Sequence, residues 1–344
     1  MISDLQDTDK RIIPILKVLS ESSEPLGSTI VSRELKRFGI NLSARSVRYH
    51  FLITDIRGYT QSFVHDGRML TPKGLEELKI ALAAGHVGFA LERLETLAFQ
   101  TTFNPQKRSG LVPINSSLID KNKFRDAMTF ICEVLEAGFG VSKFIAIAHE
   151  GEKLGSIVVP EGKIGIGTVC SVVFNGVLSK LGVPIESKFG GLLELRNPQR
   201  ERFAAIIYYN GTSLDPSEQY IRARMTNVRE AIKTGRGRII ADFREIPSSS
   251  RTLVSEILAK MKEAGIGGVY RLGNSGESIC QLPVGFNRAG LIFLDGLNPL
   301  AAVMEAGIEI ENNSESGLIE FQKLIDYQKI QLSLSSPSNV LELS

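Results

Sequence analysis

The strongest constraint on the fold of this chain is a long internal repeat. Residues 164–195 are rich in glycine and recur about 125 residues later as residues 289–321. The motif EAGFG at 136–140 likewise recurs as EAGIG at 263–267. Solenoid repeats are only about 20 to 50 residues long, so this spacing predicts two similar halves packed about a local two-fold axis. The aligned pairs include Gly165 with Gly290, Gly182 with Gly307, Glu186 with Glu311 and Glu194 with Glu320.

The two halves are expected at about 111–235 and 236–330. Each is predicted to run strand, helix, three strands, helix and strand, with a strand near 278–282 in the second copy and a long helix over 215–233 closing the first. Since helices and strands are interleaved and several turns are short and glycine-rich, we expect a mixed sheet. A Ser-rich flexible tail is predicted at 331–344.

Residues 1–75 precede the repeat and predict three helices followed by a hairpin. Ser43 is a typical N-cap for the third helix, over 44–56. Asp66-Gly67 is a strong hairpin signal between two short strands. This order of elements is typical of a winged helix-turn-helix domain. The predicted fold class is therefore α+β, with an N-terminal winged helix-turn-helix domain and a mixed α/β effector domain made of two similar halves.

Positive charge gathers in this first domain. The net charge of the chain is only +2, but between Arg33 and Lys73 there are eight Lys and Arg against three acids. The start of a winged-helix third helix faces base edges in the major groove, and a local basic excess is typical of nucleic-acid binding. The residues predicted to contact DNA are Ser43, Arg45, Ser46, Arg48, Tyr49 and His50 on that helix and His65 and Arg68 on the wing. Winged helices that bind RNA or protein remain alternatives.

Residues 76–110 are expected to connect the two domains. Leu91, Leu94, Leu97 and Ala98 form an apolar stripe at helical spacing. Such a stripe could pack on its own domain or on a partner chain, and both interpretations stand. The polar segment Asn104–Gly110 (NPQKRSG) is the expected linker.

The effector site is predicted in the first half, which has residues that the second lacks. A strand leading into a helix at about Val173 offers backbone N–H groups and the positive end of a helix dipole, which suit a carboxylate. Lys188 lies beside a glycine pair and is replaced in the second copy by the Asn312–Ser314 segment. The predicted effector-binding residues are Gly167, Thr168, Cys170, Ser171, Asn175, Ser187, Lys188, Gly190, Gly191, Thr212, Ser213, Arg222 and Arg224.

Catalytic chemistry finds little support in the sequence. The Gly165-x-Gly167-Thr168 motif lacks the lysine of a phosphate-binding loop and the full dinucleotide fingerprint. The three cysteines are odd in number and widely spaced, which fits neither a disulfide framework nor a metal cluster. We therefore predict no catalytic residue, no metal site and no cofactor. Neither a secretory pattern nor an apolar run of membrane-spanning length is present, so a cytoplasmic protein is expected.

Several long motifs resemble one family, the nitrogen regulatory repressors of archaea known as NrpR. They are IGIGTVCSVVFNGVLSKLGVPIESKFGGLLELR, YNGTSLDPSEQYI, REAIKTGRGRIIADFREIP, MKEAGIGGVYRLG and GLNPLAAVMEAGI. The resemblance extends over nearly the whole chain, to about Tyr327. It implies a repressor of nitrogen-assimilation genes that binds an inverted-repeat DNA operator as a homo-oligomer, a dimer or a tetramer. It also implies release from DNA when 2-oxoglutarate binds as an allosteric effector.

Some members of that family carry two effector domains, whereas this chain has one, so a related repressor subunit is a further conceivable partner. Two other classes of function stay open on the residues alone. One is a metabolite-binding enzyme with an appended winged-helix regulatory domain, which turnover of a keto acid would reveal. The other is an adaptor whose winged helix binds protein, which salt-independent association would reveal because DNA affinity falls steeply with salt.

Overall fold

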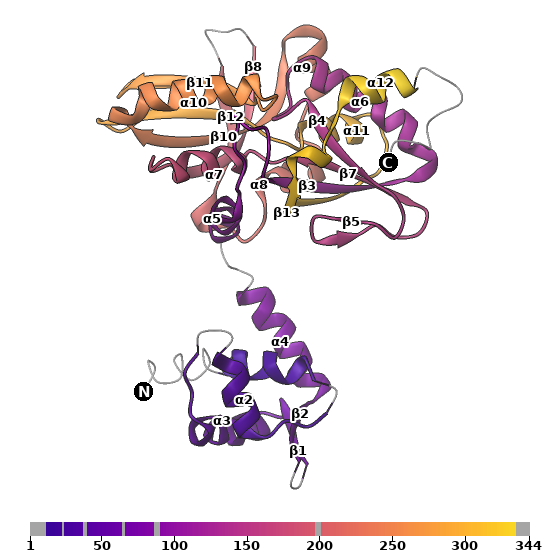
Figure 1. The fold of residues 1–344 in the computed structure, drawn as a ribbon, viewed down its shortest axis with the longest axis vertical. Coiled ribbons are helices and arrows are strands. Elements are labelled where there is room, and N and C mark those ends of the chain that lie inside the picture. Colours follow the sequence, from indigo (N-terminus) through magenta and orange to yellow (C-terminus); the bar gives the residue numbers. More distant parts are fainter. Residues whose placement is uncertain are drawn as a thin grey trace. The chain divides into compact units, whose positions relative to one another are not determined.

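A computed structural model describes residues 12–22, 24–36, 40–63, 66–85, 90–196 and 201–334. The chain divides into two compact units, residues 1–88 and 89–344 (Figure 1). The boundary therefore falls between Gly88 and Phe89, whereas the linker had been predicted at Asn104–Gly110. That polar segment instead lies within the second unit, where Asn104 bridges Ser109 and the Arg108 guanidinium donates to the Glu263 carbonyl at 2.7 Å.

The described part of the first unit contains three helices, a hairpin and a fourth helix. Residues 12–20 are helical, and α2 (Ser28–Leu35), α3 (Ala44–Ile56), β1 (Thr60–Phe63), β2 (Gly67–Leu70) and α4 (Pro72–Gly85) follow. The strands β1 and β2 pair antiparallel. The helices meet in a small core of apolar side chains, among them Ile15, Val31, Leu35, Val47 and Phe51. This arrangement confirms the predicted winged helix-turn-helix fold.

The second unit is built on two five-stranded sheets. The first has the order β11-β12-β10-β8-β9 and the second the order β13-β3-β7-β4-β14. Every ladder among the described residues is antiparallel, so the expected mixture of parallel and antiparallel pairs is not found. The strands are β3 (Leu111–Asp120), β4 (Phe144–Ala148), β7 (Lys163–Val169), β8 (Glu186–Leu195), β9 (Arg202–Tyr208), β10 (Gly237–Pro247), β11 (Val269–Ser275), β12 (Arg288–Leu294), β13 (Glu311–Glu320) and β14 (Ile325–Asp326), with a small hairpin of β5 (Lys153–Leu154) and β6 (Ile157–Val158).

The two halves exchange their last repeated strands. In the alignment of the repeat, β7 corresponds to β12 and β8 corresponds to β13. However, β8 pairs with β10 of the second half, and β13 pairs with β3 of the first half. The predicted two similar halves are therefore present, but each sheet contains strands from both. Separating the halves would break two complete ladders, so they form one folding unit.

Helices pack against both sheets and complete two apolar cores. One core joins α6 (Phe124–Glu136), α9 (Val228–Thr234) and α11 (Asn298–Glu305) to strands of both sheets. The other core does the same with α7 (Val172–Lys180) and α10 (Arg251–Glu263). Figure 1 shows α6, α11 and α12 (Tyr327–Leu334) as one group of helices. At the junction of the halves, the Phe174 ring stacks on the Phe293 ring with centroids 4.3 Å apart.

Three local predictions were wrong. The long helix over 215–233 is two helices, α8 (Pro216–Arg222) and α9, because Arg224 takes a left-handed conformation with φ 52°. The segment 278–282 is a turn with a single bridge between Ile279 and Leu282. Residues 331–334, which were predicted to belong to a flexible tail, continue α12, and residues 335–344 lie outside the described part of the chain.

The helix α5 (Ala90–Gln100) is the first element of the second unit and packs within it. Its buried side chains include Leu94, Leu97 and Ala98, which contact Val172 of α7 and Tyr209. Of the two open interpretations of this apolar stripe, packing on the helix's own domain is the one that the structure shows. The Ala90 N–H also donates to the Thr212 carbonyl at 2.8 Å.

Candidate functional site

The start of α3 presents the predicted DNA-reading surface. The Ser43 hydroxyl accepts a hydrogen bond from the Ser46 N–H at 3.2 Å and so caps the helix. Val47 is buried, which turns Arg45 and Arg48 to the exposed face of the helix. Tyr49 is also exposed, at 62%. Two guanidinium groups and a phenol therefore stand together where a winged helix reads DNA.

Two other residues from the predicted DNA set, His50 and Arg68, are placed differently. His50 is buried at 3% exposure, so its side chain belongs to the packing of the unit, and the predicted DNA contact is corrected. Arg68 donates to the Asp55 carboxylate at 3.0 Å and lies over the Phe51 ring, which fastens the wing to α3. His65 lies outside the described residues.

A pocket of about 610 Å³ lies in the second unit. Five parts of the chain form it: α5, α7, the start of β8 with the residues before it, the end of β9 with the turn Tyr209–Gly211, and the start of β12. Its lining residues are Leu91, Glu95, Asn175, Ser179, Pro184, Ile185, Glu186, Ser187, Lys188, Tyr208, Asn210 and Arg288. Of the predicted effector residues, Asn175, Ser187 and Lys188 meet here.

Two cations set the charge of this pocket together with Glu95 and Glu186 of its lining and Glu245 behind it. The Lys188 ammonium pairs with Glu186 at 2.5 Å and with Glu245 at 3.4 Å. The Arg288 guanidinium pairs with the same two carboxylates, at 3.0 Å and 3.6 Å. Glu186 is 55% exposed in its side chain, whereas Glu245 is only 10% exposed. Glu186 is therefore the carboxylate that an anionic ligand could replace at little cost.

The amide of Asn175 provides a neutral group in the same pocket. Its Nδ2 donates to the Ser187 hydroxyl at 3.0 Å, while its Oδ1 has no hydrogen-bond partner among the described residues. Asn175 is only 4% exposed. A buried polar atom without a partner costs free energy, so a ligand group that donates a hydrogen bond to Oδ1 would recover part of that cost.

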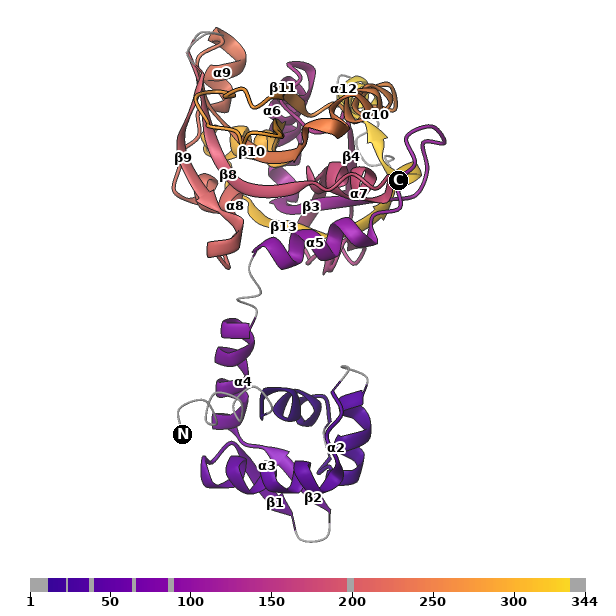
Figure 2. The ribbon, with the colours of Figure 1, turned by 90° about the vertical axis from the view of Figure 1, so that its left-hand side faces the viewer.

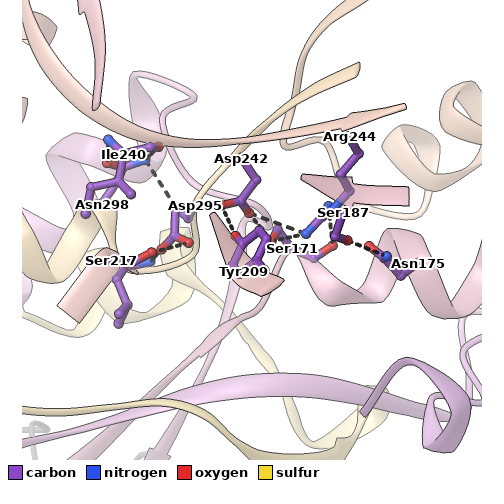
Figure 3. A network of polar contacts seen from close by, with 11 residues as sticks. Ser171, Asn175, Ser187, Tyr209, Ser217, Ile240, Asp242, Arg244, Asp295 and Asn298 are labelled. Atoms are coloured by element: carbon purple, nitrogen blue, oxygen red, sulfur yellow. Dashed lines mark hydrogen bonds and ion pairs between the residues drawn. The ribbon is translucent and has the colours of Figure 1, made fainter. Parts of the chain in front are cut away.

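A buried polar network lies next to the Asn175–Ser187 hydrogen bond (Figure 3). The Arg244 guanidinium donates to the Ser171 hydroxyl at 2.8 Å and pairs with Asp242 at 3.4 Å. The Ser171 hydroxyl in turn donates to Asp242. The Tyr209 hydroxyl donates to the other oxygen of Asp242 at 2.7 Å. Ser171 precedes α7 of the first half, whereas Asp242 and Arg244 lie on β10 of the second half, so this network joins the two halves.

Several predicted effector residues serve packing instead. Ser171 belongs to the buried network, and Asp242 occupies the place at the start of α7 where a ligand carboxylate had been expected. Cys170 is fully buried, and burial raises the pKa of its thiol well above its usual range. A side chain at Gly190 would collide with Pro216, and one at Gly191 would collide with Phe203. Thr168 is buried, and Gly167 packs against Ala146. These six residues lie outside the pocket lining.

The remaining predicted residues lie elsewhere. Thr212 and Ser213 hold α5, since the Ser213 carbonyl accepts a hydrogen bond from Arg93 at 3.1 Å. Arg222 lines a different pocket of about 420 Å³, together with Glu218, Ile221, Met304, Glu309, Ile310, Glu311, Asn312 and Asn313. Arg224 is exposed and pairs with Glu309 at 3.5 Å.

The two pockets are equivalent by the repeat. With the spacing of 125 residues, Ser179 aligns with Met304, Glu186 with Glu311, and Lys188 with Asn313, and each pair has one member in each pocket. The smaller pocket has asparagine where the larger one has Lys188. The duplication thus produced two pockets, and the predicted effector list contains residues of both.

Sequence reasoning missed several residues of the larger pocket, and one of them comes from the other half. Arg288 begins β12 in the second half, and Tyr208 and Asn210 follow β8 through β9. Arg288 aligns with Lys163 in the repeat, so the cation itself was visible in the sequence. The position of Arg288 beside Lys188 could not be predicted, because that position results from the exchange of β8 into the other sheet.

Four acidic side chains gather near the same junction. They are Asp215, Asp242, Asp295 and Glu315, and burial is the main reason why the pKa of Asp295 and that of Glu315 lie well above their usual values. Burial, with Glu218 and Asp242 as negatively charged neighbours, likewise raises the pKa of Asp215 to about 7. In the folded protein Asp215 therefore keeps its proton up to about pH 7.

We expect the stability of the protein to fall as the pH rises from about 5 to about 8. The unfolded chain releases the Asp215 proton near pH 4, roughly, whereas the folded chain keeps it until about 7. The folded state thus binds more protons in this window, and the free energy of unfolding decreases with rising pH. Asp215→Asn keeps an oxygen that can accept from the Glu218 N–H, and should be more stable than the parent at pH 8 by roughly 1–2 kcal/mol.

Urea unfolding at pH 5 and pH 8 measures this effect. Glu309→Gln, at a side chain that is 78% exposed, is the control and should leave the pH dependence unchanged. If the free energy of unfolding depends on pH in the same way in the parent and in Asp215→Asn, the raised pKa does not belong to Asp215.

Among the residues that the structure describes, no group of three or more His, Cys, Asp or Glu side chains has the arrangement of a metal site. The three cysteines are buried and unpaired by disulfides. In the described ranges, no helix is both long enough and apolar enough to span a membrane.

Comparison with known proteins gives consistent matches. The family described as NrpR regulatory domains NRD1 and 2 matches residues 87–326, and the ribonuclease R winged-helix domain family matches residues 13–78. A protein named global nitrogen regulator NrpRI from Methanosarcina mazei is 37% identical, over 92% of this chain and 97% of its own. A global nitrogen regulator NrpR from Methanocaldococcus jannaschii is 28% identical, over 94% of this chain and 56% of its own length.

A solved structure shares the fold. The crystal structure of a nitrogen repressor-like protein from Methanococcus jannaschii superposes with a TM-score of 0.60 and 27% identity. The match covers 70% of this chain and 98% of that one.

Proposed function

Since the chain belongs to the NrpR family of nitrogen regulators, we propose that it represses nitrogen-assimilation genes by binding an inverted-repeat operator and leaves DNA when 2-oxoglutarate binds. The observation that carries this proposal is the pocket around Lys188 and Arg288. Lys188 and Arg288 lie there together, and both pair with the exposed carboxylate of Glu186, while Glu95 lines the same pocket from α5. The two cations suit the carboxylates of a small dianion, which would take the place of Glu186 beside them.

The pocket also suits a regulatory role, because α5 forms part of its wall. Leu91 and Glu95 of that helix line the pocket, and α5 is the first helix after the boundary that follows Gly88. A ligand between α5 and Lys188 would therefore act on the segment that leads to the winged helix. Coupling between two sites is typically about 1–3 kcal/mol, which corresponds to roughly tenfold to a hundredfold weaker operator binding.

Non-enzymatic action is part of the proposal. The relatives are named regulators, and the pocket side chains are engaged in ion pairs and amide contacts rather than in a nucleophile–base pair. The specific experiment is a fluorescence anisotropy titration with the inverted repeats upstream of the chain's own gene, with and without 2-oxoglutarate. Operator affinity that 2-oxoglutarate leaves unchanged would reject the effector part of the proposal.

Arg48→Ala tests the DNA-reading surface. We expect operator affinity to fall by about 1–3 kcal/mol and sequence preference to relax at one base pair, because a bidentate guanidinium contact to guanine is lost. Arg33→Ala on α2 is the matched control, since it removes the same charge from a side chain that is 74% exposed outside α3. Sequence preference should persist in the control. Unchanged affinity and preference in Arg48→Ala would show that α3 is not the recognition helix.

A further inference from the structure

We propose that the outer edge of β9 is the surface through which two copies of this chain associate. The strand ends its sheet and pairs only with β8. No backbone hydrogen bond between described residues reaches its other side. Figure 2 shows β9 at the left margin of the second unit, and no helix or strand label lies beyond it. Such an edge presents a row of unpaired N–H and C=O groups.

The sequence of β9 does little to protect this edge. Proteins usually guard an edge strand with lysine, proline or a covering element, but β9 reads RFAAIIY. Its single charged residue, Arg202, donates to Glu194 on the neighbouring strand at 3.0 Å. The other exposed side chains are Ala204, Ile206 at 39% and Tyr208 at 53%. An unguarded apolar edge is explained most simply if another strand covers it.

A second copy of the same strand fits this edge. A two-fold interface must be self-complementary, and antiparallel pairing centred on Ala205 meets that condition. Ala204 of each copy would lie opposite Ile206 of the other, a small side chain against a large one. Arg202 would lie opposite Tyr208, a cation beside an aromatic ring. The choice of a second copy rests on the proposed operator binding, which requires two reading heads.

This pairing would also complete the effector pocket. Tyr208 is one of the pocket-lining residues, so Arg202 of the second copy would stand at the edge of the pocket. Effector binding and the association of two copies would then share one surface. A change in effector binding would therefore alter the association of the two copies, and the reverse.

Charge substitutions at Ile206 test the interface without DNA. In sedimentation velocity experiments on the full chain, Ile206→Glu and Ile206→Lys should each weaken self-association by roughly 100-fold, since like charges become diagonal neighbours across the two-fold axis. An equimolar mixture of the two variants should associate again, because opposite charges then meet. Misfolded variants would show no such recovery. Val158→Glu, at a side chain 61% exposed on β6, is the control and should associate like the parent.

The outcomes separate this inference from the proposed function. A parent chain that stays monomeric at high concentration, or variants that associate as the parent does, would overturn the interface, whatever the operator affinity. Ala204→Glu repeats the test at a second exposed position if a substitution at Ile206 impairs folding. Intact association combined with a failure to bind the operator would reject the proposed function and leave the interface standing.

Discussion

Replacing Arg244 with methionine is expected to lower the free energy of unfolding by about 3–5 kcal/mol. The Arg244 side chain is 0% exposed, and its guanidinium pairs with Asp242, donates to Ser171 and lies 4.8 Å from the centre of the Phe293 ring. Methionine fills much of the same volume but leaves the Asp242 carboxylate buried without its cation. We therefore expect the loss of stability to come from the unpaired charge of Asp242 rather than from a cavity.

A second substitution separates these causes. In Asp242→Asn with Arg244→Met, the uncompensated charge is removed while Tyr209 keeps an oxygen to which its hydroxyl can donate. The double variant should therefore recover a large part of the loss seen in Arg244→Met alone. Urea unfolding measures both values. If the double variant is as unstable as the single one, the uncompensated charge of Asp242 is not the cause of the loss.

The sequence predicted the architecture well where local patterns decide it. Hydrophobic spacing, Ser43 as an N-cap and the Asp66-Gly67 turn were enough for the winged helix, because each feature acts within a few residues. The repeat likewise predicted two similar halves. The exchange of β8 and β13 could not be predicted, since both exchanged and unexchanged pairings satisfy the same alternation of side chains.

Part of the candidate pocket was predictable for the same reason. Asn175, Ser187 and Lys188 are near one another in the chain, and they do meet in one pocket. The start of α7 was expected to bind a carboxylate, and Asp242 from the other half lies there instead. A free helix terminus is visible in a sequence, but the group that fills it depends on long-range pairing. Arg288 reached the pocket through that same pairing and was missed.

Replacing both Lys188 and Arg288 with glutamine is expected to weaken 2-oxoglutarate binding by about 100-fold or more, because each charge-assisted hydrogen bond contributes roughly 1.5–3 kcal/mol. Glutamine keeps a donor and most of the side-chain volume, so the loss should report charge. Isothermal titration calorimetry measures the affinity, and operator binding without effector should match the parent. Since Lys188 and Arg288 both pair with Glu245, which is nearly buried, a thermal melt must first show that the variant is folded.

The two equivalent pockets provide the decisive control. Arg222→Gln removes a cation from the smaller pocket, and Arg224→Gln removes an exposed one that pairs with Glu309 beside it. Both variants should bind 2-oxoglutarate as the parent does, because the smaller pocket has Asn313 where the larger one has Lys188. If Arg222→Gln lost the effector while Lys188→Gln with Arg288→Gln kept it, the effector would belong to the second pocket. The wall formed by α5 would then have no part in the response.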